Sequence, residues 1–157
     1  MKKRPLQSFS LQTVYKGVFQ WFLNIIVGVQ FGDNNFLKNE EQFIILANHN
    51  SHLDTLCLLA SLPRTIIWKV KPVAAEDYFG NTRLKASLSN YFINTLLIKR
   101  KITSKEEAHN PIDKMLEALD AGYSLILFPE GSRGAAESMD KLKTGIARIL
   151  SARPHIK

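Results

Sequence analysis

Cysteine is almost absent from this chain of 157 residues, because Cys57 is the only one. A single cysteine cannot form an internal disulfide and cannot build a cysteine-based zinc site, so nothing here requires an oxidising compartment. Glycine and proline are sparse as well, at 8 and 6 residues, while 45% of the residues are hydrophobic. These proportions exclude disorder, collagen and disulfide scaffolds, and they predict one globular domain in a cytoplasmic setting.

Negative charge is missing from the first part of the chain. Residues 1–32 contain four cations and no aspartate or glutamate, and the first acidic residue is Asp33. Over the whole chain, 21 Lys and Arg oppose 14 Asp and Glu, which gives a net charge of +7. This balance predicts a negatively charged partner, either nucleic acid, anionic lipid or a phosphorylated small molecule.

Long hydrophobic runs are missing too. Within residues 8–30, Gln12, Lys16, Gln20 and Asn24 repeat every four residues. A membrane span needs about 20 predominantly apolar residues, so this pattern predicts an amphipathic helix and neither a span nor a cleaved signal. The expected apolar face contains nine residues: Leu11, Val14, Tyr15, Val18, Phe19, Phe22, Ile25, Ile26 and Val29.

Two placements of this helix are open. It could pack on the domain core, or it could lie in a membrane interface. In the second case Trp21 and the phenylalanines would enter the headgroup boundary, and the basic residues Lys2, Lys3 and Arg4 would face anionic lipid.

The rest of the chain alternates short apolar strands with helical segments. Strands are expected at residues 43–47, 66–70, 96–98 and 124–128, and helices at 53–62, 111–121 and 141–152. This order predicts an α/β domain over residues 36–157, with a mixed sheet flanked by helices, after an amphipathic helical segment over residues 1–35. Sites in such folds lie where strands end.

His49 and Asp54 are five residues apart, where the first of these strands ends and a helix begins. An aspartate that folds back onto one imidazole nitrogen fixes the tautomer, and the other nitrogen can then deprotonate a substrate hydroxyl. The alternative is a loop histidine bonded to a helix-capping aspartate. A metal site that also uses His52 is disfavoured, because the three residues share one turn and no further His is near in sequence.

A second polar motif, Phe-Pro-Glu-Gly-Ser-Arg-Gly, occupies residues 128–134 directly after the last strand. Its proline and glycines favour a tight turn with available backbone N–H groups. Arg133 adds a planar cation that suits a phosphate or a carboxylate. The alternative is a loop in which Glu130 and Arg133 pair with each other.

Both motifs resemble blocks of the glycerolipid acyltransferases, the family of 1-acylglycerol-3-phosphate (lysophospholipid) acyltransferases. Residues 48–54, Asn-His-Asn-Ser-His-Leu-Asp, resemble the family's His-x-x-x-x-Asp signature, and residues 128–133 resemble its Phe-Pro-Glu-Gly-Thr-Arg block with Ser132 for threonine. Leu97-Ile98-Lys99-Arg100 is similar to the block that ends in arginine, and Lys143-Thr144-Gly145 to a later Lys-x-Gly.

The resemblance covers about residues 40–150, with two departures. The family's fourth block, an apolar strand with a central proline, has no counterpart before Lys157, so the domain is expected to lack the family's carboxyl-terminal part. Asn94 also stands where members of the family often carry glycine.

The resemblance implies a glycerol-phosphate acyltransferase-like fold and a reaction of phospholipid biosynthesis. A fatty acyl group would pass from acyl-CoA or acyl carrier protein to the hydroxyl of a lysophospholipid such as lysophosphatidic acid, with no metal or cofactor. His49 would be the general base and Asp54 would orient it, and the predicted substrate-binding residues are Arg100, Glu130, Gly131, Ser132 and Arg133. The expected location is the cytoplasmic face of an anionic membrane, peripheral or shallowly inserted.

Two other functions remain as alternatives. One is a membrane-associated relative that binds lipid without catalysis. The other is a basic nucleic-acid-binding domain, suggested by the net charge and by the triplet Lys99-Arg100-Lys101. The triplet is isolated, no aromatic residues interleave with basic ones, and the Phe-Pro-Glu-Gly motif would have no role, so no nucleic-acid partner is expected.

Overall fold

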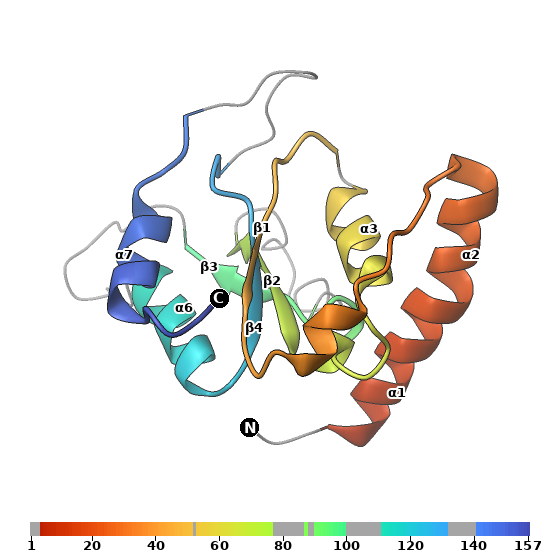
Figure 1. Ribbon diagram of the computed structural model, residues 1–157, viewed down its shortest axis with the longest axis horizontal. Coiled ribbons are helices and arrows are strands. Elements are labelled where there is room, and N and C mark those ends of the chain that lie inside the picture. The colour runs from red at the N-terminus through yellow and green to blue at the C-terminus, as the bar shows by residue number, and fades with distance from the viewer. Residues whose placement is uncertain (1–3, 52, 77–86, 88–89, 100–110, 132–140) are drawn as a thin grey trace.

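The computed structural model describes residues 4–51, 53–76, 87, 90–99, 111–131 and 141–157. Four strands form one sheet in the order β1-β4-β2-β3 (Figure 1). Their bounds are Ile44–Leu46 for β1, Val70–Ala75 for β2, Leu96–Ile98 for β3 and Ser124–Leu127 for β4. The α/β class is confirmed, but the described strands all pair in parallel, so the expectation of a mixed sheet is wrong in that respect.

Helices cover both faces of the sheet, with α3 (Asp54–Ser61) on one side and α6 (Pro111–Asp120) and α7 (Gly145–Ala152) on the other (Figure 1). The central strand β4 shows why this arrangement is stable. Ile126 belongs to the hydrophobic cluster under α3, whereas Leu125 and Leu127 belong to the cluster under α6 and α7. A strand buried on both faces needs a continuous apolar run, and β4 has one.

The second strand lies further along the chain than expected. Residues 66–70 were predicted as a strand, but Ile67–Lys69 form a 3₁₀ helix and β2 begins at Val70. Pro72 lies inside β2, which pairs with two neighbouring strands. Proline in a sheet is usually confined to edge strands, to the first residue of a strand or to bulges. Pairing with β3 begins only at Val73, so that neighbour requires no N–H group from Pro72.

Helix α6 forms where its sequence predicts a helix. Helix α6 begins at Pro111 and ends in a Schellman motif, in which Gly122 N donates to Leu119 O at 2.8 Å and Tyr123 N donates to Ala118 O at 3.0 Å. Gly122 has a φ of 86°, which is why the motif needs glycine. Helix α7 begins at residue 145, four residues after its predicted start at 141.

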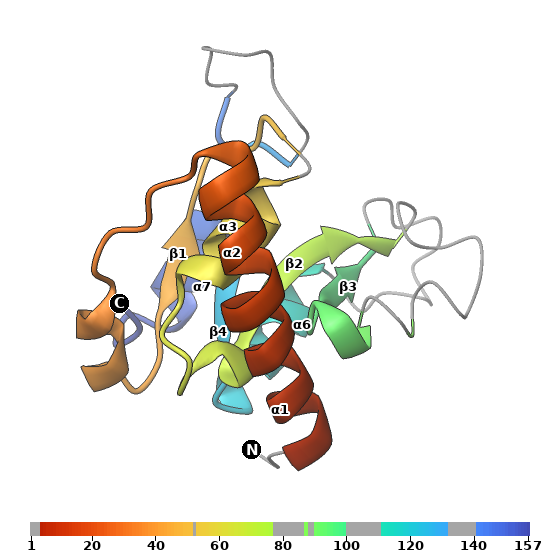
Figure 2. The same cartoon turned by 90° about the vertical axis from the view of Figure 1, so that its right-hand side faces the viewer.

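The N-terminal segment is one continuous helix made of alternating α and π turns (Figure 2). It comprises α1 (Pro5–Thr13), a π stretch over Val14–Phe19, α2 (Gln20–Phe22) and a second π stretch over Leu23–Val27, and it ends at Gly28 with a φ of 79°. Its fully buried residues, Leu11, Tyr15 and Leu23, are separated by multiples of four. A four-residue repeat drifts around an α-helix of about 3.6 residues per turn, and the wider π turns offset that drift.

The buried stripe joins the cluster that contains Leu59 and Ile67, so this helix packs on the domain. The division of the chain at residue 35 stays a prediction. A further 3₁₀ helix, Asn35–Asn39, links the segment to β1.

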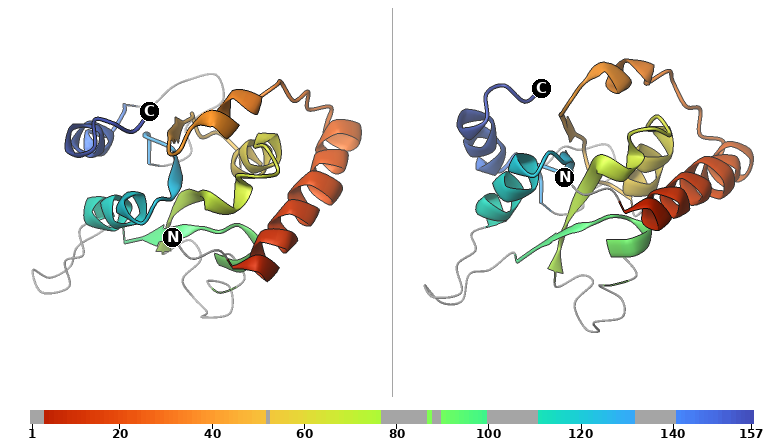
Figure 3. Two further views of the ribbon diagram at one scale, coloured as in Figure 1. Left: turned by 60° about the horizontal axis from the view of Figure 1, so that its bottom comes forward. Right: turned by 90° about the horizontal axis from the view of Figure 1, so that it is seen from below.

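The outer face of the helix differs from the predicted pattern. Two of the polar residues turn toward the domain, because Lys16 Nζ donates to Ala60 O and Gln12 Oε1 accepts from Arg64 Nε at 3.3 Å. Apolar side chains lie outside instead, where the helix runs along the edge of the molecule (Figure 3). The most exposed are Leu6 at 78%, Phe9 at 66%, Ile25 at 63%, Val18 and Ile26 at 62%, and Trp21 at 59%.

Candidate active site

The two polar motifs meet at the carboxyl edge of the sheet. His49 follows β1, Asp54 begins α3, and residues 128–131 follow β4. Strands β1 and β4 are parallel neighbours, so their carboxyl ends lie together, as the order of the elements predicts.

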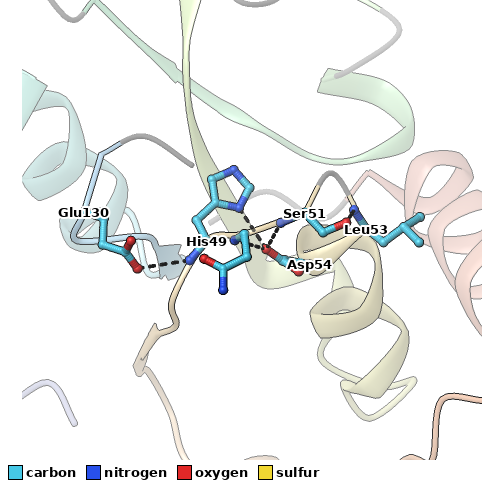
Figure 4. A network of polar contacts seen from close by, with 6 residues as sticks. His49, Ser51, Leu53, Asp54 and Glu130 are labelled. Carbon is cyan, nitrogen blue, oxygen red and sulfur yellow. Dashed lines mark hydrogen bonds and ion pairs between the residues drawn. The ribbon is translucent and has the colours of Figure 1, made fainter. Parts of the chain in front are cut away.

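Asp54 folds back onto the imidazole of His49 (Figure 4). Its Oδ2 atom lies 3.1 Å from His49 Nδ1 and also accepts hydrogen bonds from the backbone N–H groups of Asn50 and Ser51, both at 2.8 Å. Ser51 Oγ accepts a further bond from the backbone N–H of Leu53 at 3.2 Å. The same carboxylate therefore closes the loop and holds the histidine.

These contacts settle the ionisation of Asp54. Burial alone would raise its pKa, but the N–H groups of Ser51 and Asn50 and the contact with His49 outweigh burial and lower the pKa below its usual value. The first turn of α3 also favours a carboxylate there. Since ionised Asp54 is only an acceptor, Nδ1 of neutral His49 must carry the proton, and Nε2 is left as the basic nitrogen.

The turn after β4 fixes His49 from the other side. The imidazole stacks on Phe128, with ring centroids 4.2 Å apart and planes at 25°. The backbone N–H of His49 donates to Glu130 Oε1 at 3.2 Å, and Glu130 is only 3% exposed. The histidine and aspartate side chains keep 22% and 28% of their surface exposed, so the pair is accessible as well as fixed.

A cavity of about 580 Å³ opens beside His49. Its wall is mainly apolar and includes Leu56, Val73, Ile98, Met115, Phe128 and Ile146. Among the described residues of the wall, Lys99 and Lys143 add positive charge and no carboxylate is present. The site thus combines a base, an apolar chamber and two cations.

The model of a protein family described as Acyltransferase matches residues 28–156. The chain belongs to this family. It is 29% identical over 107 residues to a Caenorhabditis elegans protein, acl-2, whose assigned name is that of a 1-acyl-sn-glycerol-3-phosphate acyltransferase. That match covers 68% of this chain and 35% of the other, so the chain spans about a third of that relative's length.

A solved acyltransferase has the same fold. The lysophosphatidic acid acyltransferase PlsC of Thermotoga maritima superposes with a TM-score of 0.52, over 94% of this chain and 67% of that one. The two sequences are 17% identical, so this likeness concerns the fold. The family model over residues 28–156 confirms the family resemblance that the two motifs indicated.

Four of the seven predicted site residues of this acyltransferase chain lie in the described part. His49, Asp54, Glu130 and Gly131 come together at the carboxyl edge of the sheet, whereas Arg100, Ser132 and Arg133 lie outside the described residues, as does His52. Glu130 also has a positioning contact that the sequence did not suggest, because its carboxylate accepts the backbone N–H of His49.

Gly131 makes room for a lysine that the sequence analysis treated only as part of a motif. Its φ is 73°, and a Cβ atom there would overlap Nζ and Cε of Lys143. The backbone N–H of Lys143 donates to Pro129 O at 2.9 Å, which keeps the two segments together. The Lys-x-Gly pattern was the available signal for Lys143, and the position of Lys99 before Arg100 was the signal for Lys99.

Metal ligands are a separate question. In the part of the chain that the structure describes, no three or more His, Cys, Asp or Glu side chains gather in a way that could hold a metal ion.

Proposed function

We propose that this chain transfers a fatty acyl group from an acyl thioester to the hydroxyl of a lysophospholipid such as lysophosphatidic acid. The observation that carries the proposal is His49, held by Asp54, on the wall of a mainly apolar cavity that two lysines also line. The assigned names of the acl-2 protein and PlsC support the same acceptor class.

His49 would act as the general base through Nε2. It takes the proton of the acceptor hydroxyl while that oxygen attacks the thioester carbonyl carbon, so a C–O bond forms. The C–S bond then breaks, and the proton on Nε2 passes to the departing thiolate. Asp54 holds the Nδ1 proton and stabilises the imidazolium between these two steps. The products are a diacyl phospholipid and a free thiol, and the chemistry needs no cofactor.

The wall of the cavity has both an apolar part and a positively charged part, which match the acyl chain and the phosphate group of such substrates. Its apolar side chains would surround an acyl chain, and Lys99 and Lys143 would face a phosphate group. Arg100, Ser132 and Arg133 remain proposed phosphate and glycerol ligands. Glu130 would act on the substrate indirectly, because its described contact is with the His49 backbone.

Acyl transfer to lysophosphatidic acid in mixed micelles tests the proposal, with acyl-CoA and acyl carrier protein as separate donors. We expect His49→Ala to lose at least about 10²-fold in rate, the usual effect of removing a positioned base. His155→Ala is the matched control, because His155 is an exposed histidine outside the cavity. Equal rates for His49→Ala and wild type would refute the mechanism. Lipid binding by wild type without transfer from either donor would favour the non-catalytic alternative.

The exposed face of the N-terminal helix supports a second part of the proposal, which is peripheral docking on the anionic cytoplasmic face of a membrane. Leu6, Phe9, Trp21, Ile25 and Ile26 lie on that face, and residues 1–32 carry only positive charge. No helix in the described part of the chain is long and apolar enough to cross a bilayer. An interfacial helix would bring the domain to its amphiphilic acceptor.

Sedimentation with anionic vesicles tests this docking. The double variant Ile25→Asp/Ile26→Asp should lose most vesicle binding, because each exposed isoleucine would otherwise contribute about 1–2 kcal/mol in the interface. Leu150→Asp is the control, since that exposed leucine lies on α7 across the molecule (Figure 1). Unchanged binding of the double variant, or an equal loss in the control, would exclude the helix as the docking face.

A further inference from the structure

A second cavity, of about 90 Å³, lies at the amino ends of the strands, whereas His49 lies at their carboxyl ends. Lys71 near the start of β2 and Tyr123 just before β4 contribute to it, together with Arg4, Ser8 and Asn94. Figure 1 shows the amino end of α1 at the opposite end of the molecule from the loop that enters α3. A water needs about 10–15 Å³ by this measure, so the cavity has room for several waters or one tetrahedral oxyanion.

Among the described residues that line this space, Lys71 and Arg4 are cations and no carboxylate is present. Lys71 Nζ donates to Asn94 Oδ1 at 3.0 Å and lies 4.6 Å from the centroid of the Tyr123 ring, so its described partners are both neutral. Arg4 forms no ion pair with any residue that the structure describes. Burial and, second, the charge of Arg4 lower the pKa of Lys71 to about 8. An anion between the two groups would relieve both effects.

The donors come from two parts of the chain, with Arg4 and Ser8 at the start of α1 and Lys71 on β2. Asn94 Nδ2 donates to Trp68 O and to Val70 O, both at 3.0 Å, which directs its Oδ1 atom at Lys71. Ser8 is only 4% exposed, and its Oγ accepts from Gln12 Nε2 at 3.3 Å, so the hydroxyl proton remains to donate. Ammonium, guanidinium and hydroxyl donors that converge from different directions match a tetrahedral oxyanion better than a planar carboxylate.

We propose that this cavity binds a phosphate group through Lys71, Arg4 and Ser8. The group is either free inorganic phosphate or the headgroup of a phosphomonoester lipid. This site is distinct from the acceptor site proposed beside His49, because the two lie at opposite edges of the parallel sheet.

Calorimetric titration of the chain with inorganic phosphate, at constant ionic strength in sodium chloride, tests the site. Lys71→Met and Arg4→Gln should each weaken binding by about 10-fold or more, because each removes a charge-assisted contact. Arg64→Gln is the matched control, because it removes a cation that contacts Gln12 on the same helix but lies outside the cavity. Arg4 is exposed, so Arg4→Gln should fold normally, and circular dichroism checks the fold of Lys71→Met.

Vesicles of neutral lipid with and without phosphatidic acid distinguish the two sources. If a lipid headgroup is the ligand, inorganic phosphate competes with the phosphatidic acid vesicles and Lys71→Met binds them more weakly. If free phosphate is the ligand, Lys71→Met binds vesicles like wild type but no longer binds phosphate. Both results support the site.

Absence of phosphate binding by wild type, or equal losses in Arg64→Gln and Arg4→Gln, would overturn the proposal. Acyl transfer by Lys71→Met should equal that of wild type, because Lys71 lies away from His49. Failure of the phosphate site and failure of the proposed enzymatic function therefore give different results.

Discussion

Asp54→Asn should separate the proposed catalysis from the folding of the loop over residues 49–54, because one carboxylate oxygen serves both. Oδ2 accepts the backbone N–H groups of Asn50 and Ser51 at 2.8 Å each and lies 3.1 Å from His49 Nδ1. Asparagine keeps a carbonyl oxygen that can accept the two backbone bonds. It carries no charge to stabilise an imidazolium, and its amide can present the wrong group to Nδ1.

The two losses should differ in size. A hydrogen bond to a charged group contributes about 1.5–3 kcal/mol and a neutral one about 0.5–1.5 kcal/mol, so two weakened backbone bonds cost roughly 1–3 kcal/mol of unfolding free energy. The side chain of Asp54 is 28% exposed, which favours the lower end. Loss of an oriented general base should cost 10²- to 10⁴-fold in rate, or about 2.7–5.5 kcal/mol of activation free energy. Asp54→Ala should lose as much activity and more stability.

The assay pairs acyl transfer rates with urea unfolding for wild type, Asp54→Asn and Asp54→Ala. Asp33→Asn is the matched control, because Asp33 Oδ1 also accepts a backbone N–H, from Asn35 at 2.9 Å, in a turn outside the cavity. Activity of folded Asp54→Asn within about threefold of wild type would refute the role given to the carboxylate. Equal stability losses in the two Asp54 variants would refute its role in closing the loop.

Three further predictions concern Asp54, Asn94 and Gly131. Because the pKa of Asp54 is lowered on folding, its contribution to stability is present above the unfolded value of about 3.8 and is lost as pH falls through the lower folded value; the stability gap between wild type and Asp54→Asn should therefore close in acid unfolding curves below about pH 4. Asn94→Ala should cost about 2–4 kcal/mol by thermal unfolding, because it loses three bonds at 3.0 Å and keeps a φ of 56°, while Asn94→Gly should cost less because glycine tolerates that angle. Gly131→Ala should displace Lys143 and strain a φ of 73°, at about 1–2 kcal/mol of stability, with a rise in KM for the acceptor in the transfer assay.

Sequence patterns predicted the contact between His49 and Asp54 because its geometry is local. His49 and Asp54 lie on either side of one tight loop, so the spacing of five residues is enough to bring their side chains together. The apolar run before His49 and the run before Pro129 predicted strands, and parallel pairing placed both motifs at one edge. Glu130 could not be assigned its contact in this way, because its hydrogen bond with His49 joins residues 81 positions apart.

The sequence prediction placed the second strand too early, because a buried apolar run does not have to be a strand. Ile66 and Ile67 are buried, as an apolar run suggests, but they pack in a 3₁₀ turn on the cluster under the N-terminal helix. The strand itself contains Lys71 and Pro72, two residues that a propensity argument assigns to a loop. Tertiary pairing with β4 determines the outcome at these positions.

The orientation of the N-terminal helix could not be read from its pattern either, because two of its faces are apolar. The choice between them depends on the π turns, which keep Leu11, Tyr15 and Leu23 in one stripe against the domain and leave Trp21, Ile25 and Ile26 outside. Figure 1 shows the carboxyl end of this helix at the same end of the molecule as the loop that enters α3. At the amino end of the helix, Arg4 and Ser8 line the cavity proposed above to bind phosphate. If the helix lies flat in a membrane interface, as proposed, the face that carries Trp21, Ile25 and Ile26 is the one that meets the lipid. Substitutions that turn the π stretches into regular α-helix should rotate the outer face and the buried stripe together, so vesicle binding and stability should fall in parallel.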